Sequence, residues 1–179
     1  MVKIAPSILS ADFVNLERDI HKVSSADYLH VDVMDGCFVP NITIGIPVVK
    51  SIRKCTDMFL DVHLMIDDPL TYAEPFAKAG ASLITFHLEC GCDTAATLAR
   101  IKALGCKTGL SVKPHTSVQA LFPYLDQLDL ALVMSVEPGF GGQKFMPMAL
   151  DKIHALREEI DRRGLSCLVE VDGGVDAVT

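Results

Sequence analysis

Short apolar segments rich in β-branched residues alternate along the whole chain with longer segments of helical character. This alternation constrains the fold more than any other feature, because strands and helices in strict succession form a parallel sheet with right-handed crossovers. Seven strands are predicted, at KIAPSIL (3–9), YLHVDVM (28–34), FLDVHLM (59–65), SLITFHL (82–88), KTGLSV (107–112), LALVMSV (130–136) and CLVEVD (167–172). The sheet can be either doubly wound or closed into a barrel.

The segments between the predicted strands carry the boundary residues of helices. Asp68 and Pro69 are suited to cap and begin one helix, and Gly80 follows its last turn. The stretch 148–163 has apolar residues at helical spacing and is followed by Gly164. Helices therefore connect the predicted strands.

Two observations favour a barrel over a doubly wound sheet. No GxGxxG or GxxxxGKS/T sequence follows the first predicted strand, as a dinucleotide-binding or P-loop fold would require. Polar residues instead recur at the carboxyl ends of several strands, where TIM barrels carry their active sites. A complete TIM (β/α)8 barrel has eight strands and about 250 residues. We therefore expect residues 1–179 to form a single α/β barrel domain that is truncated at its C-terminus and lacks the eighth βα repeat.

The composition limits the partners and the location of the protein. Hydrophobic residues make up 50% of the chain and charged residues 22%, which is typical of a folded globular core. The net charge of −7 argues against a surface for nucleic acid or anionic membrane. No apolar run has the roughly 18 residues of a membrane span, and the chain does not begin with a signal peptide. We expect a soluble cytoplasmic protein with reduced, mostly buried cysteines. Cys90 and Cys92 could form a soft metal clip, but two thiols alone are weak evidence for one, and a loop is the favoured interpretation.

Alternation within three strands points ionisable side chains into the barrel. Successive residues of a strand face opposite sides of the sheet, and the apolar residues must face the helices. The side chains left on the inner face are His30 and Asp32 in 28–34, Asp61 and His63 in 59–65, and Glu170 and Asp172 in 167–172. Such groups are costly to desolvate unless something compensates them.

Two imidazoles and two carboxylates suit one divalent metal ion. The candidate ligands are His30, Asp32, His63 and Asp172. They favour Zn²⁺ or Fe²⁺, with Mn²⁺ and Co²⁺ as alternatives, and leave coordination positions for a substrate oxygen. Taken singly, each residue has an ordinary explanation, such as a polar pair of His30 with Asp32 or a satisfied core histidine at His63. The four together favour a metal site.

Glycine-rich turns follow the last two predicted strands, at 137–143 and 172–174. Loops at these barrel positions bind phosphate through backbone N–H groups, although either turn alone could be an ordinary turn. Three methionines fall at matching heights on the strands, either as core filling or as an apolar lid over the substrate. The expected substrate contacts from the turns and methionines are Met34, Met65, Met134, Gly139, Phe140, Gly141, Gly142, Gly173 and Gly174.

At these residues the chain resembles the ribulose-phosphate 3-epimerase family, over residues 3–175. The resemblance rests on APSILSADF, DYLHVDVMDGCFVPNITIG, LDVHLM, AGASLITFHLE, ALVMSVEPGFGGQKF and EVDGG. It implies an isomerase of the pentose phosphate pathway that interconverts D-ribulose 5-phosphate and D-xylulose 5-phosphate by inversion at C3. We also expect a homo-oligomer.

The resemblance implies specific roles for the candidate residues. The metal ligands would be His30, Asp32, His63 and Asp172, and the acid/base groups would be Asp32 and Asp172 on opposite faces of the substrate. Two groups are needed because a single base would return the proton to the face that it left. A metal ion acting as a Lewis acid would stabilise the enediolate. Ser7 and His63 would contact the sugar, and the phosphate would lie against Gly141, Gly142, Gly173 and Gly174.

Three other functions compete with this interpretation. A 3-epimerase of a six-carbon ketose phosphate, such as allulose 6-phosphate, would use the same metal and aspartates, although EPGFGGQ and VDGG are more similar to the pentose enzyme. A non-catalytic phosphate-binding barrel fragment would be expected to lack some of these residues. An aldolase or decarboxylase would need a lysine at a strand end, for which Lys113 is the candidate, and a solvated loop lysine is its simpler explanation.

Overall fold

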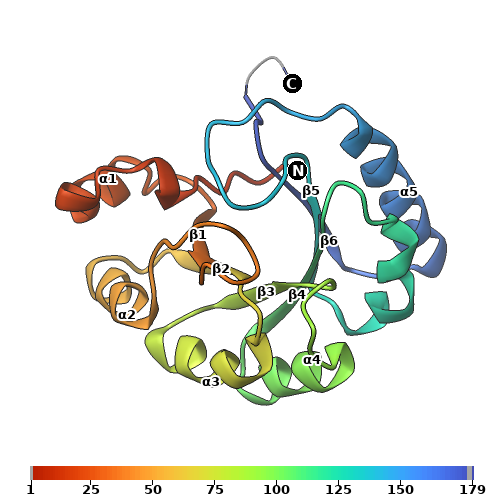
Figure 1. The fold of residues 1–179 in the computed structure, drawn as a ribbon, viewed down its shortest axis with the longest axis horizontal. Helices are drawn as coiled ribbons and strands as arrows, with labels where there is room; N and C mark the ends of the chain where they lie inside the picture. Colours follow the sequence, from red (N-terminus) through yellow and green to blue (C-terminus); the bar gives the residue numbers. More distant parts are fainter. Residues whose placement is uncertain (1, 177–178) are drawn as a thin grey trace.

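A computed structural model describes residues 2–176 and 179. Across these residues, six parallel strands lie side by side in chain order and curve into an open barrel, with the helices outside (Figure 1). The strands are β1 (Tyr28–Met34), β2 (Phe59–Met65), β3 (Leu83–His87), β4 (Lys107–Val112), β5 (Leu130–Met134) and β6 (Leu168–Asp172). The helices are α1 (Leu16–Lys22), α2 (Ile46–Cys55), α3 (Pro69–Ala79), α4 (Thr94–Ala103) and α5 (Met148–Arg163), with 3₁₀ segments η1 (Ile8–Ser10), η2 (Phe13–Asn15) and η3 (Val118–Gln127). The predicted α/β barrel is confirmed.

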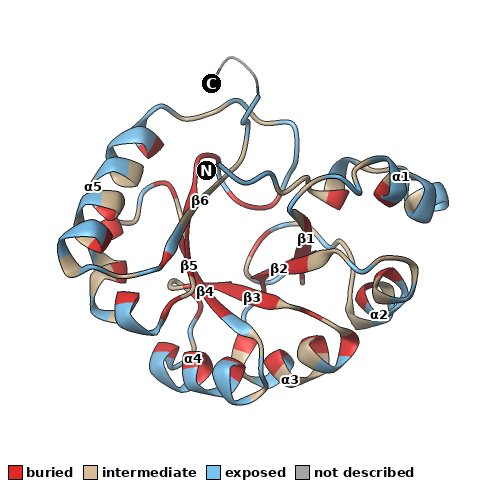
Figure 2. Ribbon diagram, turned by 180° about the vertical axis from the view of Figure 1, so that it is seen from behind, coloured by how far each residue is buried: buried red, intermediate tan, exposed pale blue. Residues whose placement is uncertain are grey.

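The apolar core lies between the sheet and the surrounding helices. Val31 of β1 and Val62 of β2 are fully buried in one cluster with Ile52 of α2 and Phe76 of α3. Figure 2 shows buried residues along the strands and on the inner sides of the helices, whose outer sides are exposed. Burial of each such apolar side chain stabilises the fold by about 1.5–3 kcal/mol. The inner face of the sheet is thereby left to carry polar groups, as the alternation predicted.

The predicted helix boundaries at α3 and α5 are confirmed. The Asp68 carboxylate accepts a hydrogen bond of 3.1 Å from the backbone N–H of Thr71, and Pro69 begins α3. Gly80 follows the last turn of α3 with φ of 109°, a conformation that a side chain would disfavour. Gly164 ends α5 in the same way. Local signals were therefore sufficient to locate these helices.

The strand predicted at residues 3–9 is not formed. The segment lies along β1, where the carbonyl of Ile4 accepts from Tyr28 N at 3.2 Å and that of Pro6 accepts from His30 N at 3.0 Å. A strand does not continue because Pro6 has no N–H, and because Ser7 already caps the 3₁₀ turn η1 by accepting from Leu9 N. One bridge, between Ser7 and His30, is all the regular pairing that the described part of this segment makes.

The barrel is open between the N-terminal segment and β6. The ring of helices is interrupted between α1 and α5, where the loop after β5 and the end of the chain run (Figure 1). The residues of β6 are half-buried or exposed, whereas those of β3 and β5 are buried throughout. A cleft of about 1030 Å³ lies along this opening and reaches the carboxyl ends of the strands. Among residues 2–176 and 179, none of the helices combines the length and the apolar character needed to cross a membrane.

The cysteines are free thiols, but the expectation that most are buried is wrong. Burial is incomplete because several lie in loops at strand or helix ends rather than inside elements. Two cysteines are buried, Cys90 and Cys167. Three are half-buried, Cys55, Cys92 and Cys106, and Cys37 is exposed. Cys90 and Cys92 lie in the predicted loop, with their sulfurs 3.1 Å apart.

Candidate active site

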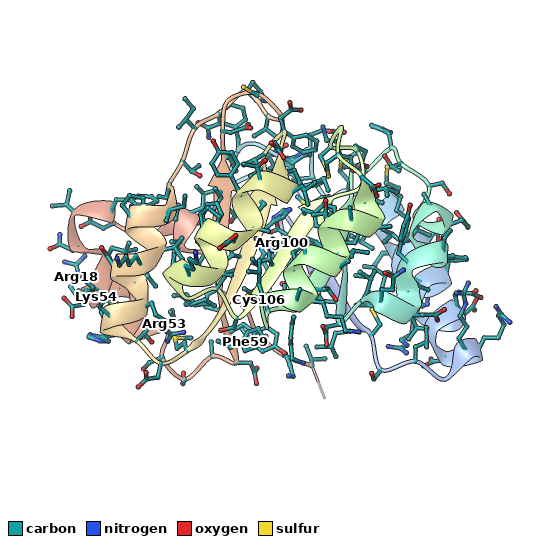
Figure 3. The ribbon with its side chains drawn as sticks, turned by 90° about the horizontal axis from the view of Figure 1, so that it is seen from below. Arg18, Arg53, Lys54, Phe59, Arg100 and Cys106 are labelled. Atoms are coloured by element: carbon teal, nitrogen blue, oxygen red, sulfur yellow. The ribbon has the colours of Figure 1, made fainter. Side chains whose placement is uncertain are left out.

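The pairing of β1 with β2 places a histidine beside an aspartate at two positions along the strands. The two strands pair so that His30 lies next to Asp61, and Asp32 lies next to His63. Phe59, the first residue of β2, and Cys106, just before β4, lie at one end of the barrel (Figure 3). Because the strands are parallel, their carboxyl ends, and the polar side chains near those ends, lie at the other end of the barrel.

The four predicted metal ligands converge at this end of the barrel. Each offers one ligand atom, and these atoms all lie within 4.8 Å of one another. Asp32 Oδ1 lies 3.3 Å from His30 Nε2 and 3.2 Å from His63 Nδ1. Asp172 Oδ2 lies 3.8 Å from His63 Nδ1. Strands β1, β2 and β6 thus bring together residues that are up to 142 positions apart (172 − 30).

The protonation of this cluster is set by burial and by neighbouring charges. Burial opposes a charged His30, but the carboxylates of Asp32 and Asp61 hold the pKa of His30 well above its usual range. Burial likewise opposes an ionised Asp32, yet His30 and His63 hold the pKa of Asp32 well below its usual range. Burial, together with the charge of Asp32, raises the pKa of Asp172. The two aspartates therefore differ in their affinity for a proton.

Asp61 and Glu170 lie behind His30. His30 Nδ1 is 2.7 Å from Asp61 Oδ2 and 3.5 Å from Glu170 Oε1. Burial and the nearby Asp61 carboxylate raise the pKa of Glu170 to about 7. These three residues could also group around a cation. The short His30–Asp61 contact has the geometry of a hydrogen bond, so we interpret Asp61 as the partner that orients the His30 ring.

His87 is a polar residue of the site that the sequence analysis missed. Its Nε2 lies 2.9 Å from His63 Nε2, and its ring is fully buried beneath Phe38, with the ring centroids 4.9 Å apart. Burial lowers the pKa of His87 to about 4, so the ring is neutral near pH 7. The signal was present in the sequence. The alternation that directed His63 inward also places Thr85 and His87 on the inner face of the segment 82–88.

The other predicted site residues surround the cleft. Ser7 Oγ donates a hydrogen bond of 2.5 Å to Asp32 Oδ2. The predicted residues that line the cleft are Ser7, His30, Asp32, Met34, Met65, Met134, Gly139, Phe140, Gly141, Gly142, Asp172, Gly173 and Gly174. His63 is absent from the described lining because its ring is fully buried behind the cleft surface. The three methionines are buried and also border the cleft, so both explanations offered for them agree with their positions.

The two glycine-rich loops are tied to the strand ends by side-chain hydrogen bonds. Ser135 Oγ lies 2.8 Å from the carbonyl oxygen of Asp172 and 2.6 Å from that of Gly173. Asn41 Nδ2 donates to the carbonyl of Gly139 at 2.8 Å. Gly174 has φ of 65°, and a Cβ there would collide with the backbone of Phe145. The loops are thus close-packed at positions where backbone N–H groups could approach an anion.

Lys113 does not occupy the position of a catalytic lysine. Its ammonium lies 3.9 Å from the centre of the Phe38 ring, in cation–π geometry. It is not among the described residues that line the cleft. The arrangement therefore does not favour Schiff-base chemistry at this lysine.

A family model and several curated proteins that resemble this chain all point to the same family. The model of the ribulose-phosphate 3 epimerase family matches residues 3–179. The ribulose-phosphate 3-epimerase of Bacillus subtilis is 50% identical, covering 100% of this chain and 84% of that protein. That of Synechocystis is 52% identical, covering 97% and 77%, and that of Mycobacterium tuberculosis is 51% identical, covering 97% and 76%.

Solved structures of low sequence identity agree with the fold. A tryptophan synthase α-subunit from Pyrococcus furiosus superposes with a TM-score of 0.67 at 11% identity, covering 94% of this chain and 86% of that one. A dipeptide epimerase from Enterococcus faecalis gives a TM-score of 0.56 at 16% identity, covering 96% and 48%. These likenesses concern the barrel fold alone.

Proposed function

Because the chain belongs to the ribulose-phosphate 3-epimerase family, we propose that it inverts C3 of D-ribulose 5-phosphate to give D-xylulose 5-phosphate. The observation that carries the proposal is the convergence of two histidines and two aspartates at the cleft: His30, Asp32, His63 and Asp172. An enzyme that inverts a carbon next to a ketone needs acid/base groups and a charge that stabilises the enediolate. This cluster can provide both.

The cluster fits a divalent metal ion, for which we propose Zn²⁺ or Fe²⁺. His30 Nε2 is buried and has no hydrogen-bond partner among the described residues, although it lies in the middle of the cluster. In the absence of a metal, the neighbouring carboxylates favour a proton on this nitrogen, which a metal ion would displace. Two imidazole nitrogens and two carboxylate oxygens form a donor set typical of these ions. When bound, the ion supplies positive charge beside the enediolate oxygens.

Asp32 and Asp172 move the protons in this proposal. One carboxylate takes the proton from C3, and the other delivers a proton to C3 from the opposite face, so the configuration is inverted. Their opposite pKa shifts suit a pair in which one member is ionised while the other holds a proton. The two roles exchange when the reaction runs in reverse. The Ser7 hydroxyl orients Asp32 and contacts the sugar.

The remaining parts of the cleft position the substrate. The backbone N–H groups of Gly141, Gly142, Gly173 and Gly174 hold the phosphate. Met34, Met65 and Met134 cover the reacting carbons and exclude water, and Gly139 and Phe140 border the sugar. We further propose that the protein acts in the cytoplasm, in the pentose phosphate pathway, and as a homo-oligomer. A rice relative, 50% identical, is named a cytoplasmic isoform.

Proton NMR of D-ribulose 5-phosphate in D₂O tests the proposal. With Zn²⁺ or Fe²⁺ added, the protein should introduce deuterium at C3 and form D-xylulose 5-phosphate. Asp32→Asn and Asp172→Asn should each lower the rate by about 10²–10⁴-fold, since each removes one acid/base group. Asp126→Asn, at an exposed aspartate, is the matched control. Absence of exchange at C3 in the metal-loaded protein would overturn the proposal, and faster turnover of allulose 6-phosphate would redirect it to a six-carbon substrate.

A further inference from the structure

The two ring nitrogens of His63 have different surroundings. Nδ1 faces the carboxylates of Asp32 and Asp172, at 3.2 and 3.8 Å. Nε2 faces Nε2 of His87 at 2.9 Å. Two ring nitrogens at this distance share one proton, so one ring donates and the other accepts.

The direction of this hydrogen bond determines whether His63 can bind a metal. A neutral imidazole carries one proton, and the nitrogen that binds a metal must be free of it. If His63 binds through Nδ1, its proton lies on Nε2 and is donated to His87. His87 must then carry its own proton on Nδ1.

Glu89 favours this direction. His87 Nδ1 lies 3.4 Å from Glu89 Oε2, and neither of these buried atoms makes a hydrogen bond with any described residue. A carboxylate oxygen facing a buried ring nitrogen favours a proton on that nitrogen. The protons are therefore ordered so that His63 Nε2–H donates to His87 Nε2, while His87 Nδ1–H is directed toward Glu89.

We propose that His87 and Glu89 are positioning residues that hold His63 in the tautomer whose Nδ1 is free to bind the metal ion. The inference rests on the metal site of the proposed function. His87 contacts His63, and Glu89 contacts His87. Neither residue is among the described residues that line the cleft.

The surroundings hold His87 and Glu89 in place and cover the His87 ring. Phe38 covers the His87 ring, and the Lys113 ammonium lies over the Phe38 ring. Glu89 Oε1 accepts a hydrogen bond of 2.7 Å from the backbone N–H of Lys113. The Lys152 ammonium holds the same loop by donating to the carbonyls of Lys113 at 3.0 Å and Thr116 at 2.6 Å. A preorganised partner of this kind fixes the orientation of a metal ligand.

Zinc affinity of three variants tests the proposal. His87→Leu removes the acceptor at similar volume and should weaken Zn²⁺ binding by about 10–100-fold, measured by competition with a chelator. His87→Gln can still accept from His63 and donate toward Glu89, so it should restore most of the affinity. Thr85→Val, at a fully buried residue two positions earlier in β3, is the control and should bind Zn²⁺ as the unchanged protein does.

Long-range ¹H–¹⁵N NMR of the histidine rings gives a second readout that does not depend on activity. In the Zn²⁺-loaded protein, His63 should carry its proton on Nε2 and His87 on Nδ1. A His87 ring protonated on Nε2, or Zn²⁺ bound to His63 Nε2, would overturn the inference. Unchanged affinity in a folded His87→Leu variant would overturn it as well. Failure of the unchanged protein to bind Zn²⁺ would instead count against the proposed function.

Discussion

His30 and His63 reach the same cluster from neighbouring strands, but different groups hold their rings. Behind His30 lies a carboxylate, Asp61, at 2.7 Å. Behind His63 lies a second imidazole, His87, at 2.9 Å. A carboxylate partner makes a histidine a stronger donor to a metal than a neutral partner does. The two histidines are therefore expected to contribute unequally to the affinity of the site for a metal ion.

The difference follows from how much negative charge the barrel interior can hold. Asp32 and Asp61 are already buried, and Glu170 beside Asp61 has its pKa raised to about 7. A further carboxylate next to His63 would add a buried charge, at a cost of several kcal/mol. A neutral His87 instead directs its Nδ1 toward Glu89, whose side chain is 22% exposed. The negative charge behind His63 and His87 therefore lies on Glu89, where water can reach it.

Replacing Asp61 should have the largest effect on this comparison. Asp61→Leu leaves the Nδ1–H of His30 buried with only the longer 3.5 Å contact to Glu170 Oε1, which costs about 1–3 kcal/mol of stability. We expect Zn²⁺ affinity to fall by about 100-fold, at the upper end for partners of metal-binding histidines, with His87→Leu nearer the lower end. Chelator competition on both variants measures the difference. A weaker effect at Asp61 than at His87 would contradict the unequal contribution of the two histidines.

Phe38→Ala should expose His87, the partner of His63, and leave the surroundings of His30 unchanged. The half-buried ring packs on His87, so its removal should destabilise the fold by about 2 kcal/mol, less than the 3–5 kcal/mol of a fully buried phenylalanine. Water would then reach His87, and Zn²⁺ affinity should fall by a few-fold, less than in His87→Leu. Chemical denaturation and Zn²⁺ competition measure the two effects. Phe13→Ala, at a residue that is 48% exposed, is the control and should change stability by at most about 1 kcal/mol.

Glu89→Gln should have the smallest effect. The amide oxygen can still accept from His87 Nδ1–H, and only the charge is lost. Since a charged acceptor forms a hydrogen bond about twice as strong as a neutral one, we expect Zn²⁺ affinity to fall by about three-fold. Glu158→Gln, at an exposed residue of α5, is the matched control. An effect as large as that of His87→Leu would mean that the Glu89 charge itself is required.

Much of the site could be predicted from the chain because its signals are local. The two-residue period of the strands was enough to direct His30, Asp32, His63 and Asp172 to the inner face, and the structure brings them together. Helix α3 was located from Asp68, Pro69 and Gly80. The strand at 3–9 was predicted wrongly because its apolar character outweighed Pro6, which has no N–H to donate, and because the turn capped by Ser7 follows at once.

The sequence by itself determined which side chains face the barrel interior, because alternation in a strand depends only on neighbouring residues. Tertiary structure decided which of these side chains touch. The parallel register pairs His30 with Asp61 and Asp32 with His63, and the curvature of the sheet brings His87 of β3 against His63. Register and curvature arise from packing between segments far apart in the chain. For that reason the partners of the two histidines, and the difference between them, could not be predicted from either strand alone.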